Sequence, residues 1–458
     1  MNKQIPILYV FFFLSSGAFN LNWAQPATLT LQEAINQATT HHPSIRSAEE
    51  KSEIQAQAFK LTNKALLPEV NLYAQASLAT FNNITGMYIP QNGLWPISGP
   101  PSDENNGQAA WGSVAGAGFS WEPFTFGERK NRIHQAEADY QSSRRELELV
   151  RFNHLSNVIY QYLSTLAAQK NIEAMQANLE RAEEVYKVIY TLTVSELRPG
   201  VDTALAQAEV SRAKINVREA QKCFQVAQAK MTELINMNDD FQLAEAPFYT
   251  ELPAQEMTEP TVHPLIQVYE SRMTSDQLGL AATKKVYFPE LRLTGTYYVR
   301  GSGVANDLSA DHNAGAGFNF ERYNYGIGLA LSLPILDYAR YGHQIKMQES
   351  QLSASQYALE SQELAINQQL RSASEQLEYA LFSANETPVQ LRSSQYAYEM
   401  MRARYESGLV NFQELVQTQY LLTEAEVNDI NARISAWQAL LQQAAASGDL
   451  SLFLNQIQ

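Results

Sequence analysis

Few residues of this sequence have the types and spacing that a reactive site needs. The seven histidines are scattered without metal-ligand spacing, and no phosphate-binding loop, nucleophile elbow or zinc-protease motif occurs. Asp307, Asp311 and Asn313 offer oxygen ligands of the kind that calcium prefers, but they lack its regular ligand spacing and are assigned to a loop. The sequence therefore predicts no enzyme activity, no cofactor and no bound metal.

The most informative polar residue follows a sharp interruption of a very long helical stretch. From Glu128 to Arg198 the chain contains neither proline nor glycine, and then Pro199 and Gly200 occur together. Both residue types favour a tight reversal of the chain. Asp202 follows near the start of another alanine-rich run, where the partial positive charge of a helix N-terminus stabilises an acid. The sequence predicts a helical hairpin with Asp202 close to its tip.

A second acid occupies the equivalent place later in the chain. Gly408 is the only glycine between Gly342 and Gly448, and Glu414 follows it at the start of another helical run. Glu414 lies 212 positions after Asp202. Helix capping and solvation explain such acids as well as a role at an opening does, so both interpretations are kept.

The matched acids belong to a wider internal repeat. The segment HPSI at 42–45 recurs as HPLI at 263–266, and proline-anchored matches downstream keep the same offset of 221 residues. Around the two tips the offset falls to 212 residues, and the difference lies between the strands, where loops accept insertions. Each half reads as helix, strand, loop, strand, very long helix, turn and helix. The predicted fold is mainly α with a small β part and is internally duplicated.

This repeat sets the expected boundaries. Residues 1–24 combine a basic start, an apolar run and small residues, which is typical of a secretory signal peptide. The first repeat is expected at 25–240, a linker or equatorial segment at 241–262, the second repeat at 263–447 and a C-terminal tail at 448–458. The first helix, from about Leu31 to Leu66, is expected to break at His42-Pro43. Strands are expected at about 68–80, 110–122, 289–300 and 323–334.

The predicted strands each have two different faces. In the last one, apolar residues from Tyr323 to Leu333 alternate with small or polar ones, and the other three strands show the same period of two. A soluble sandwich would give this pattern, and so would a membrane barrel with lipid on its apolar side. The export signal and the aromatic residues at strand ends favour the barrel. Because about eight strands are needed for the smallest barrel, several chains must pool their four strands.

The long helical stretches extend far beyond the thickness of a bilayer. The 71 residues from Glu128 to Arg198 would reach roughly 100 Å at ~1.5 Å per residue. Apolar residues at helical spacing predict coiled-coil packing, and abundant Ala, Gln and Ser elsewhere allow helices to pack on two sides, as in a ring. Pro388 lies inside the second long stretch and is expected to kink or break that helix.

Composition excludes some partners. The net charge of −15 makes a nucleic-acid partner unexpected, since a phosphate-binding surface is basic. Only the N-terminal segment is apolar enough to resemble a spanning helix. The single cysteine, Cys223, lies inside a helical run and has no disulfide partner. The sequence thus describes an exported protein without disulfides.

Five segments carry a resemblance to a known family. LTLQEAINQATTHHPSI resembles its opening, PFTFGERKNRI and PILDYARYGHQI resemble its strand-to-helix junctions, and LRPGVDTALAQAEV and RYESGLVNFQELVQTQ resemble its two helical tips. In this order they resemble the TolC-like outer membrane efflux protein family of Gram-negative bacteria, over nearly the whole mature chain. The resemblance implies a homotrimer with a twelve-stranded barrel in outer membrane lipid, continuous with a long helical barrel crossing the periplasm. A periplasmic adaptor protein and an inner-membrane transporter are the implied partners.

The resemblance also implies roles at the tips. Asp202 and Glu414 match acids at the periplasmic entrance, Tyr405 matches a tyrosine that helps to hold the entrance shut, and the neighbouring Arg404 is included as a candidate. Tyr405 is equally well explained by packing alone. The sequence also departs from the family pattern, with His42 for asparagine, Glu196 for glycine, Val410 for arginine and Gln417 for a second acid.

The leading hypothesis is therefore a passive exit duct for efflux, or for protein secretion, which the sequence does not separate from efflux. The alternative from another class is a soluble periplasmic coiled-coil scaffold. The two pairs of alternating strands argue against that scaffold, because a coiled-coil scaffold does not need strands with an apolar face.

Overall fold

The computed structural model describes residues 27–82, 101–105, 107–195, 200–237, 241–254, 262–307, 309–335 and 338–457. The expected signal peptide at 1–24, Pro199, Glu196 and most of the loop between the first two strands lie outside these ranges. The chain forms two compact units. The hairpin unit comprises residues up to Thr40, Asn157–Leu252 and Ser383–Trp437, and the sheet unit comprises His41–Ser156, Pro253–Phe382 and the residues from Gln438 onward.

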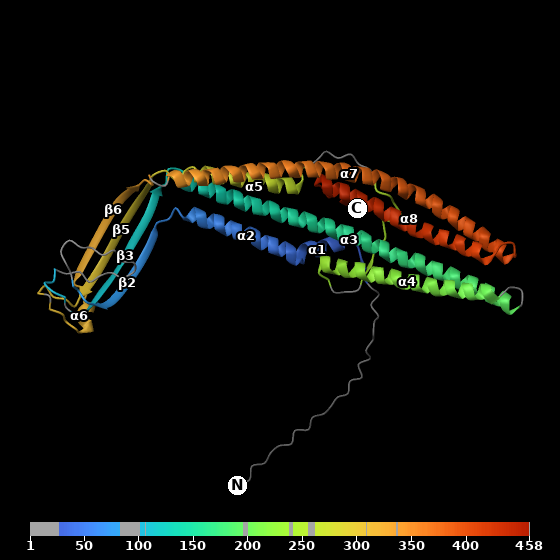
Figure 1. Cartoon of the computed structure of the whole chain (residues 1–458), viewed down its shortest axis with the longest axis horizontal. Coiled ribbons are helices and arrows are strands. Elements are labelled where there is room, and N and C mark those ends of the chain that lie inside the picture. The colour runs from blue at the N-terminus through green and yellow to red at the C-terminus, as the bar shows by residue number, and fades with distance from the viewer. Residues whose placement is uncertain are drawn as a thin grey trace, which may run out of the picture. The chain divides into compact units, whose positions relative to one another are not determined.

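The sheet unit contains four strands and the helices that lead into and out of them (Figure 1). The strands run antiparallel in the order β2-β3-β5-β6, so β2 and β6 are the edges. All four expected strands are confirmed to within a few residues. Their bounds, with those of the short helices of this unit, are α2 Pro43–Lys64, β2 Glu69–Ala79, β3 Ala110–Phe124, α5 Pro264–Thr283, β5 Glu290–Ser302, α6 Ala314–Phe318, β6 Arg322–Ser332 and α9 Ser451–Leu454.

The register of this sheet brings the apolar residues of all four strands to one face. Leu72 is paired with Ala117, Ala117 with Tyr297 and Tyr297 with Tyr325. The rows on either side repeat the pattern because side chains alternate along each strand. On the two edge strands this face is open, with Leu72 84% and Tyr325 80% exposed. The predicted alternation is therefore confirmed across strand pairs, which a single strand could not show.

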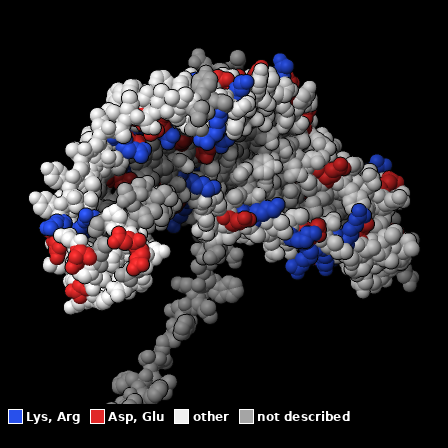
Figure 2. Space-filling view, turned by 60° about the vertical axis from the view of Figure 1, so that its left-hand side comes forward, with Lys and Arg blue, Asp and Glu red and all other residues white. Residues whose placement is uncertain are grey.

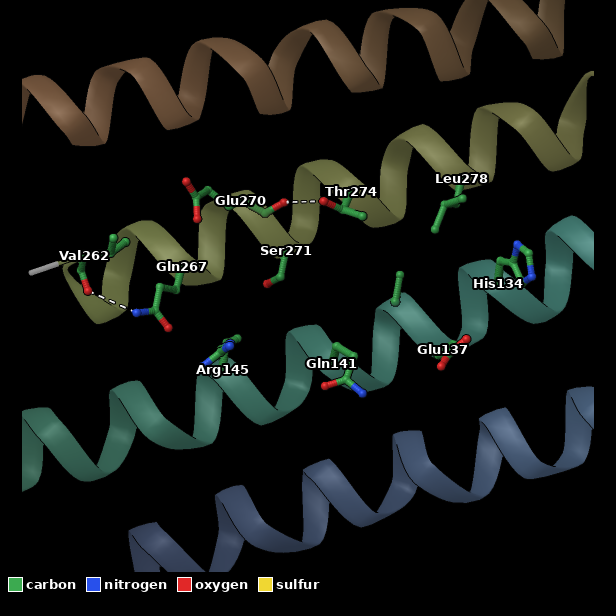
Figure 3. A pocket seen from close by; sticks show the side chains of 11 residues that line it. His134, Glu137, Gln141, Arg145, Val262, Gln267, Glu270, Ser271, Thr274 and Leu278 are labelled. Carbon is green, nitrogen blue, oxygen red and sulfur yellow. Dashed lines mark hydrogen bonds between the residues drawn. The ribbon is translucent and has the colours of Figure 1, made fainter.

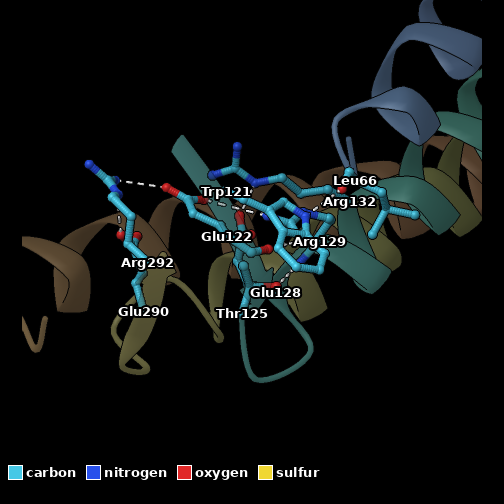
Figure 4. Close-up of polar contacts among 9 residues, drawn as sticks. All are labelled: Leu66, Trp121, Glu122, Thr125, Glu128, Arg129, Arg132, Glu290 and Arg292. Atoms are coloured by element: carbon cyan, nitrogen blue, oxygen red, sulfur yellow. Dashed lines mark hydrogen bonds and ion pairs between the residues drawn. The ribbon is translucent and has the colours of Figure 1, made fainter. Parts of the chain in front are cut away.

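Polar contacts join the sheet to the helices (Figure 4). Arg129, at the start of α3, donates to the backbone oxygen of Glu122 at 2.5 Å, and the carboxylate of Glu122 pairs with Arg292 of β5 at 2.7 Å. The indole N–H of Trp121 donates to the backbone oxygen of Leu66 at 2.9 Å. Glu122 thus connects β3, β5 and α3, and fixes the direction in which the long helix leaves the sheet.

Two long helices contribute residues to both units: α3 Glu128–Val194 and α7 Tyr338–Glu406. Within the sheet unit the helices pack side by side in the order α2, α3, α5, α7. Ion pairs join successive members: Arg151 to Glu49 at 2.5 Å, Arg272 to Glu146 at 2.5 Å, and Lys284, just after α5, to Glu349 at 3.1 Å. The unit is thus a single layer of helices with α2 and α7 at its edges.

The hairpin unit holds α1 Leu31–His41, the end of α3, α4 Gly200–Ile235, the end of α7 and most of α8 Phe412–Ser447. A short parallel ladder between β1 Ala27–Leu29 and β4 Phe241–Leu243 lies against α3. The buried hydroxyl of Tyr162 on α3 is 3.0 Å from the backbone oxygens of both Leu29 and Ala244. This contact fastens the ladder to the long helix.

Of the kink or break expected at Pro388, the break does not occur. Pro388 does not break the second long helix, because α7 is continuous from Tyr338 to Glu406. Neighbouring contacts hold the turn helical: Thr387 donates to Asp429 of α8 at 3.0 Å, and Asp429 also pairs with Arg433 at 3.1 Å. A proline inside a helix removes one backbone hydrogen bond and crowds the carbonyl four residues before it, here that of the buried Ala384. Packing against α8 therefore outweighs the loss of one backbone bond.

The His-Pro pairs that revealed the internal repeat are helix starts. The expected break at His42 is confirmed, since α1 ends at His41 and α2 begins at Pro43. The Nδ1 atom of His42 accepts from the N–H of Ser44, and that of His263 accepts from the N–H of Leu265 at 3.0 Å. The element order helix, strand, strand, long helix, helix occurs twice, while the exact repeat boundaries stay predictions. Among the described residues, no helix is both long and apolar enough to cross a membrane.

His263 predicts a pH dependence. Its Nδ1 caps α5 only when unprotonated, and Nε2 lies 3.1 Å from the backbone oxygen of Ala445. Burial lowers the pKa of His263 from its ordinary value of 6.5. The unfolded chain then binds more protons than the folded one, so this stabilisation is present above about pH 6.5 and is lost as the pH falls through the folded-state pKa. We expect the melting temperature to fall between pH 7.5 and pH 5.5.

The matched variant is His263→Asn, because asparagine caps helices at any pH. It should show a smaller pH-dependent loss in the same melting experiment, whereas His343→Asn, at an exposed site on α7, should keep the wild-type slope. Equal slopes for His263→Asn and the wild type would contradict this role.

Candidate functional site

The ends of two helical hairpins lie in the hairpin unit. The first is formed by α3, which ends at Val194, and α4, which begins at Gly200. A hydroxyl–hydroxyl bond of 2.8 Å between Thr203 and Thr193 joins its two arms. As expected, Asp202 lies in the first turn of α4. Gly200 itself has no left-handed backbone and open space around its α-carbon, so this tip does not depend on the absence of a side chain there.

The second hairpin end does depend on its glycine. Gly408 has φ +75°, in the left-handed region. The N–H of Leu409 donates to the backbone oxygen of Arg404 at 2.9 Å, and the N–H of Gly408 donates to that of Tyr405 at 3.0 Å. This pair of bonds is the Schellman arrangement that ends many helices. Arg404 thus contributes its carbonyl to the turn, while its side chain is exposed.

A residue that the sequence analysis missed starts α8. Asn411 accepts from the N–H of Glu414 at 2.9 Å, and the carboxylate of Glu414 accepts from the side-chain amide of Asn411 at 2.8 Å. Asn411 is therefore the N-cap, and Glu414 supports it from the third position of the helix. The spacing Asn-x-x-Glu was a readable signal for this cap. The side chain that caps the backbone here is that of Asn411, while the carboxylate of Glu414 is exposed, so both interpretations of Glu414 stay open.

Between the hairpins lies an apolar cluster that includes the expected tyrosine. Tyr405 is 1% exposed, and its ring centroid lies 6.1 Å from that of Phe412. Asp202 lies one turn before Ala206, which belongs to this cluster, so it is on the same side of α4. Val410, where the resemblance leads one to expect arginine, packs against the cluster. The cluster consists of Val185, Ile189, Ala206, Tyr398, Tyr405, Phe412, Leu415 and Leu422.

A layer of buried polar contacts joins α3 to α8. Arg181 binds the carboxylate of Glu426 through two parallel bonds of 2.8 and 2.7 Å, and both side chains are largely buried, at 17% and 21% exposure. Such a two-pronged pair fixes geometry as well as adding energy. Next to it the side-chain oxygen of Asn178 accepts from Gln419 at 2.9 Å and from Thr423 at 3.0 Å. These residues, more than 240 positions apart in the chain, gave no signal in the sequence analysis.

A third contact joins α4 to α8. The hydroxyl of Tyr420 donates to Glu209, while Arg212 donates to the same hydroxyl at 3.0 Å and lies over the ring with its Cζ 4.9 Å from the centroid. Burial and the bond to Glu209 raise the pKa of Tyr420 to about 12. Arg402 of α7 reaches Glu184 of α3 at 3.2 Å. The two hairpins are thus held together by polar bonds as well as by their apolar cluster.

One groove lies in the sheet unit, between α3 and α5 (Figure 3). It has a volume of about 820 Å³, and its lining includes His134, Glu137 and Arg145 of α3 and Gln267 and Glu270 of α5. Its acidic and basic groups are mixed, so it does not favour one sign of ligand charge. Within the described ranges no group of three His, Cys, Asp or Glu side chains could hold a metal ion.

Helical hairpins of this length, attached to an antiparallel sheet with one apolar face, define the class of outer membrane channels. The structure of the MtrE channel of Neisseria gonorrhoeae aligns over 92% of this chain and 89% of its own, with a TM-score of 0.74 and 20% identity. The CmeC channel of Campylobacter jejuni aligns over 97% and 94%, with a TM-score of 0.72 and 16% identity. These likenesses show the fold.

The profile of the outer membrane efflux protein family matches residues 34–237 and 263–449, so the chain belongs to this family. The outer membrane protein TolC of Escherichia coli is 21% identical over 460 residues, covering 98% of this chain and 87% of TolC. The protein is therefore an outer membrane efflux channel, as the resemblance implied, and the scaffold alternative is set aside. The family is one of transport channels rather than enzymes.

The second hairpin end gives a matched pair of variants. A β-branched residue at Gly408 must adopt φ near +75°, which costs at least about 1–2 kcal/mol, whereas Gly200 has no such constraint. We expect Gly408→Val to assemble poorly or to leak, seen as entry of vancomycin into cells. Gly200→Ala should assemble and exclude vancomycin like the wild type. Normal exclusion by Gly408→Val would show that this turn tolerates a side chain.

The pair between Arg181 and Glu426 gives a second test. Glu426→Leu leaves the guanidinium buried without its carboxylate, at a cost of about 3 kcal/mol, and should lower the melting temperature clearly. The double variant Arg181→Met, Glu426→Leu removes both charges and should recover most of the loss. If the double variant is no more stable than the single variant, the unpaired guanidinium does not explain the loss. The pair itself would then stabilise the packing of α3 against α8.

Proposed function

We propose that three copies of this chain form one closed channel, which passively conducts substrates from the periplasm to the exterior. The observation that carries this proposal is the sheet: one continuous apolar face and two edge strands, β2 and β6, whose outer sides have no strand partner among the described residues. In lipid every backbone polar group needs a partner, so β6 of one copy must pair with β2 of the next. Three copies give a barrel of twelve strands.

The helical layer supports the same arrangement. Its edge helices carry large apolar side chains that are mostly exposed: Leu61 of α2 is 74% exposed, and Tyr357 and Leu364 of α7 are 72% and 67% exposed. Joining α7 of one copy to α2 of the next buries both edges. The helices then form a ring that continues the barrel as a tunnel through the periplasm.

The hairpin ends are proposed as the entrance of that tunnel. Asp202 and Glu414 lie in first helical turns at the two tips, and their carboxylates are proposed to line the opening. Tyr405 and Arg404 contribute packing and a backbone carbonyl to the second turn. Because Val410 supplies an apolar contact where the family pattern has arginine, we propose that this entrance is closed mainly by the apolar cluster and the polar bonds above it.

A periplasmic adaptor protein and an inner-membrane transporter complete the proposed assembly. The relative CzcC of Cupriavidus metallidurans, 22% identical over 68% of this chain, is a cobalt-zinc-cadmium resistance protein, whereas OpmQ of Pseudomonas aeruginosa serves pyoverdine export. Since related channels serve such different compounds, we propose that substrate choice belongs to the transporter and that this chain supplies the passive exit.

Mass measurement in detergent tests the assembly. We expect a stable trimer and no folded monomer, because a single chain leaves β2 and β6 without partners in the membrane. A well-folded single-chain species extracted from the outer membrane would overturn the proposed channel.

Ion selectivity tests the entrance. Asp202 and Glu414 in three copies place six carboxylates around one opening, which concentrates cations, and salt screens this field beyond about 8–10 Å. We expect cation selectivity in planar bilayers and a clear reduction in the variant Asp202→Asn, Glu414→Gln. The control Glu50→Gln, Glu104→Gln removes two exposed charges elsewhere and should change the reversal potential less. If tip variant and wild type have equal reversal potentials, the two acids serve the helix starts alone.

A further inference from the structure

The loop between β5 and β6, residues 303–321, begins at the end of the sheet opposite to the long helices. The N–H of Gly303 donates to the backbone oxygen of Trp111 at 2.8 Å, and a bridge between Val304 and Ala310 extends the strand pair into the loop. The chain then turns at Asn313, whose side chain caps α6. The loop is therefore an ordered continuation of the sheet at its outer end.

After this turn the loop folds back onto the sheet. The hydroxyl of Ser113 on β3 donates to the backbone oxygen of Gly317 at 2.5 Å. A Cβ atom on Gly301 would lie 2.4 Å from the backbone oxygen of Asn319, and one on Gly317 would lie 2.4 Å from the Cβ of Trp111. Side chains at both positions are thus excluded, because the loop backbone occupies the space at Gly301 and Trp111 of β3 occupies the space at Gly317.

The covered surface is the apolar face of the sheet. Ser113 is paired directly with Gly301, and the next positions on the same face are Ala115 and Val299. This face contains Leu72, Ala117, Tyr297 and Tyr325 further along the strands. In the proposed barrel it is the outer, lipid-facing surface, so the loop leans over the outside of the barrel rather than over the pore.

The loop presents aromatic side chains there. Phe318 and Phe320 are 49% and 51% exposed, and the ring of Phe318 lies 6.1 Å from that of Trp111. Nearby on β6, Tyr323 is 68% exposed. The eight steps from Leu331 back to Tyr323, at about 3.4 Å each and a tilt of about 40°, span roughly 21 Å, close to the ~25 Å height of an apolar band. Phe318, whose ring lies beside that of Trp111, is therefore at the outer edge of that band, and Phe320 follows two residues later.

The distribution of charged side chains is consistent with a loop at the edge of the apolar band. Much of the surface over the sheet carries no charged side chain (Figure 2). The acids of the loop, Asp307 and Asp311, are exposed and hold its turns by accepting from the N–H groups of Ser309 and Asn313. The loop thus has a polar half directed toward solvent and an aromatic half beside the apolar face, which is the arrangement of segments that lie in a membrane interface.

We propose that this loop is a membrane anchor, with Phe318 and Phe320 seated in the lipid headgroup region of the outer leaflet. The inference rests on the proposed barrel, because the barrel makes the apolar face lipid-exposed. The anchor would hold the outer end of β5 and β6 at a fixed depth, in the way that aromatic girdles hold other barrels. Its occupant is a lipid surface and not another protein.

Spin labelling of the full-length channel tests the anchor. In a Cys223→Ser background, single cysteines at 318 and 320 are labelled, and the channel is reconstituted in vesicles of phosphatidylethanolamine and phosphatidylglycerol. We expect the ratio of oxygen to nickel-chelate accessibility at both positions to be at least about fivefold that of a label at Ser309, an exposed residue of the same loop. Ratios equal to that at Ser309 would overturn the anchor, and would be found if a protein were the true occupant.

A label at Leu329, in the middle of the apolar face, separates this inference from the proposed barrel. If Leu329 is lipid-accessible while 318 and 320 are not, the barrel stands and the anchor is wrong. If Leu329 is in water, the barrel itself is wrong. Phe318→Trp keeps an aromatic ring and gives a label-free measurement: its added fluorescence should be quenched at least about twofold more by lipid brominated near the headgroup than by lipid brominated near the chain end. Equal quenching by both lipids would contradict an interfacial position.

Discussion

A backbone N–H or C=O group has no hydrogen-bond partner in hydrocarbon, and much of this molecule is organised around that constraint. Four strands satisfy one another internally but leave two edges, at β2 and β6. In an outer membrane channel these edges need partners from other copies of the chain. The sheet edges are thus a reason for the proposed assembly of several copies, independent of the helices.

The helices obey a related constraint from the side chains. A layer of four helices with α2 and α7 at its edges buries little by itself, and large apolar residues on those edges are left exposed. The contacts across the layer include hydrogen bonds and exposed ion pairs, and the ion pairs contribute little each. In the proposed ring, stability would come from burying the edges between copies, where the apolar area is greatest.

The hairpin ends combine two kinds of interaction with different consequences for movement. The apolar cluster around Tyr405 is non-directional and tolerates sliding of one hairpin against the other. The bonds of Arg181, Asn178 and Tyr420 to partners on other helices are directional and hold one register. An entrance that opens must break or exchange the second kind while keeping much of the first.

Local patterns in the sequence were sufficient for much of the fold. The period of two predicted the strands, the absence of proline and glycine predicted α3, and Gly408 marked the second helix end, since each of these signals depends only on neighbouring residues. The resemblance supplied the class of protein. Asn411 was also readable as a local cap, although the sequence analysis did not use it.

Tertiary structure decided what depends on residues far apart in the chain. The pairing of Arg181 with Glu426 joins positions with no periodic relation to each other, and the contacts of Thr387 with α8 keep α7 helical through Pro388. The fold-back of the β5–β6 loop depends on the space left above Ser113 and Gly301, which exists only once β3 and β5 are paired. Sequence periodicity predicts which side of a single helix or strand is apolar. The features named here depend instead on which helices and strands pack against each other.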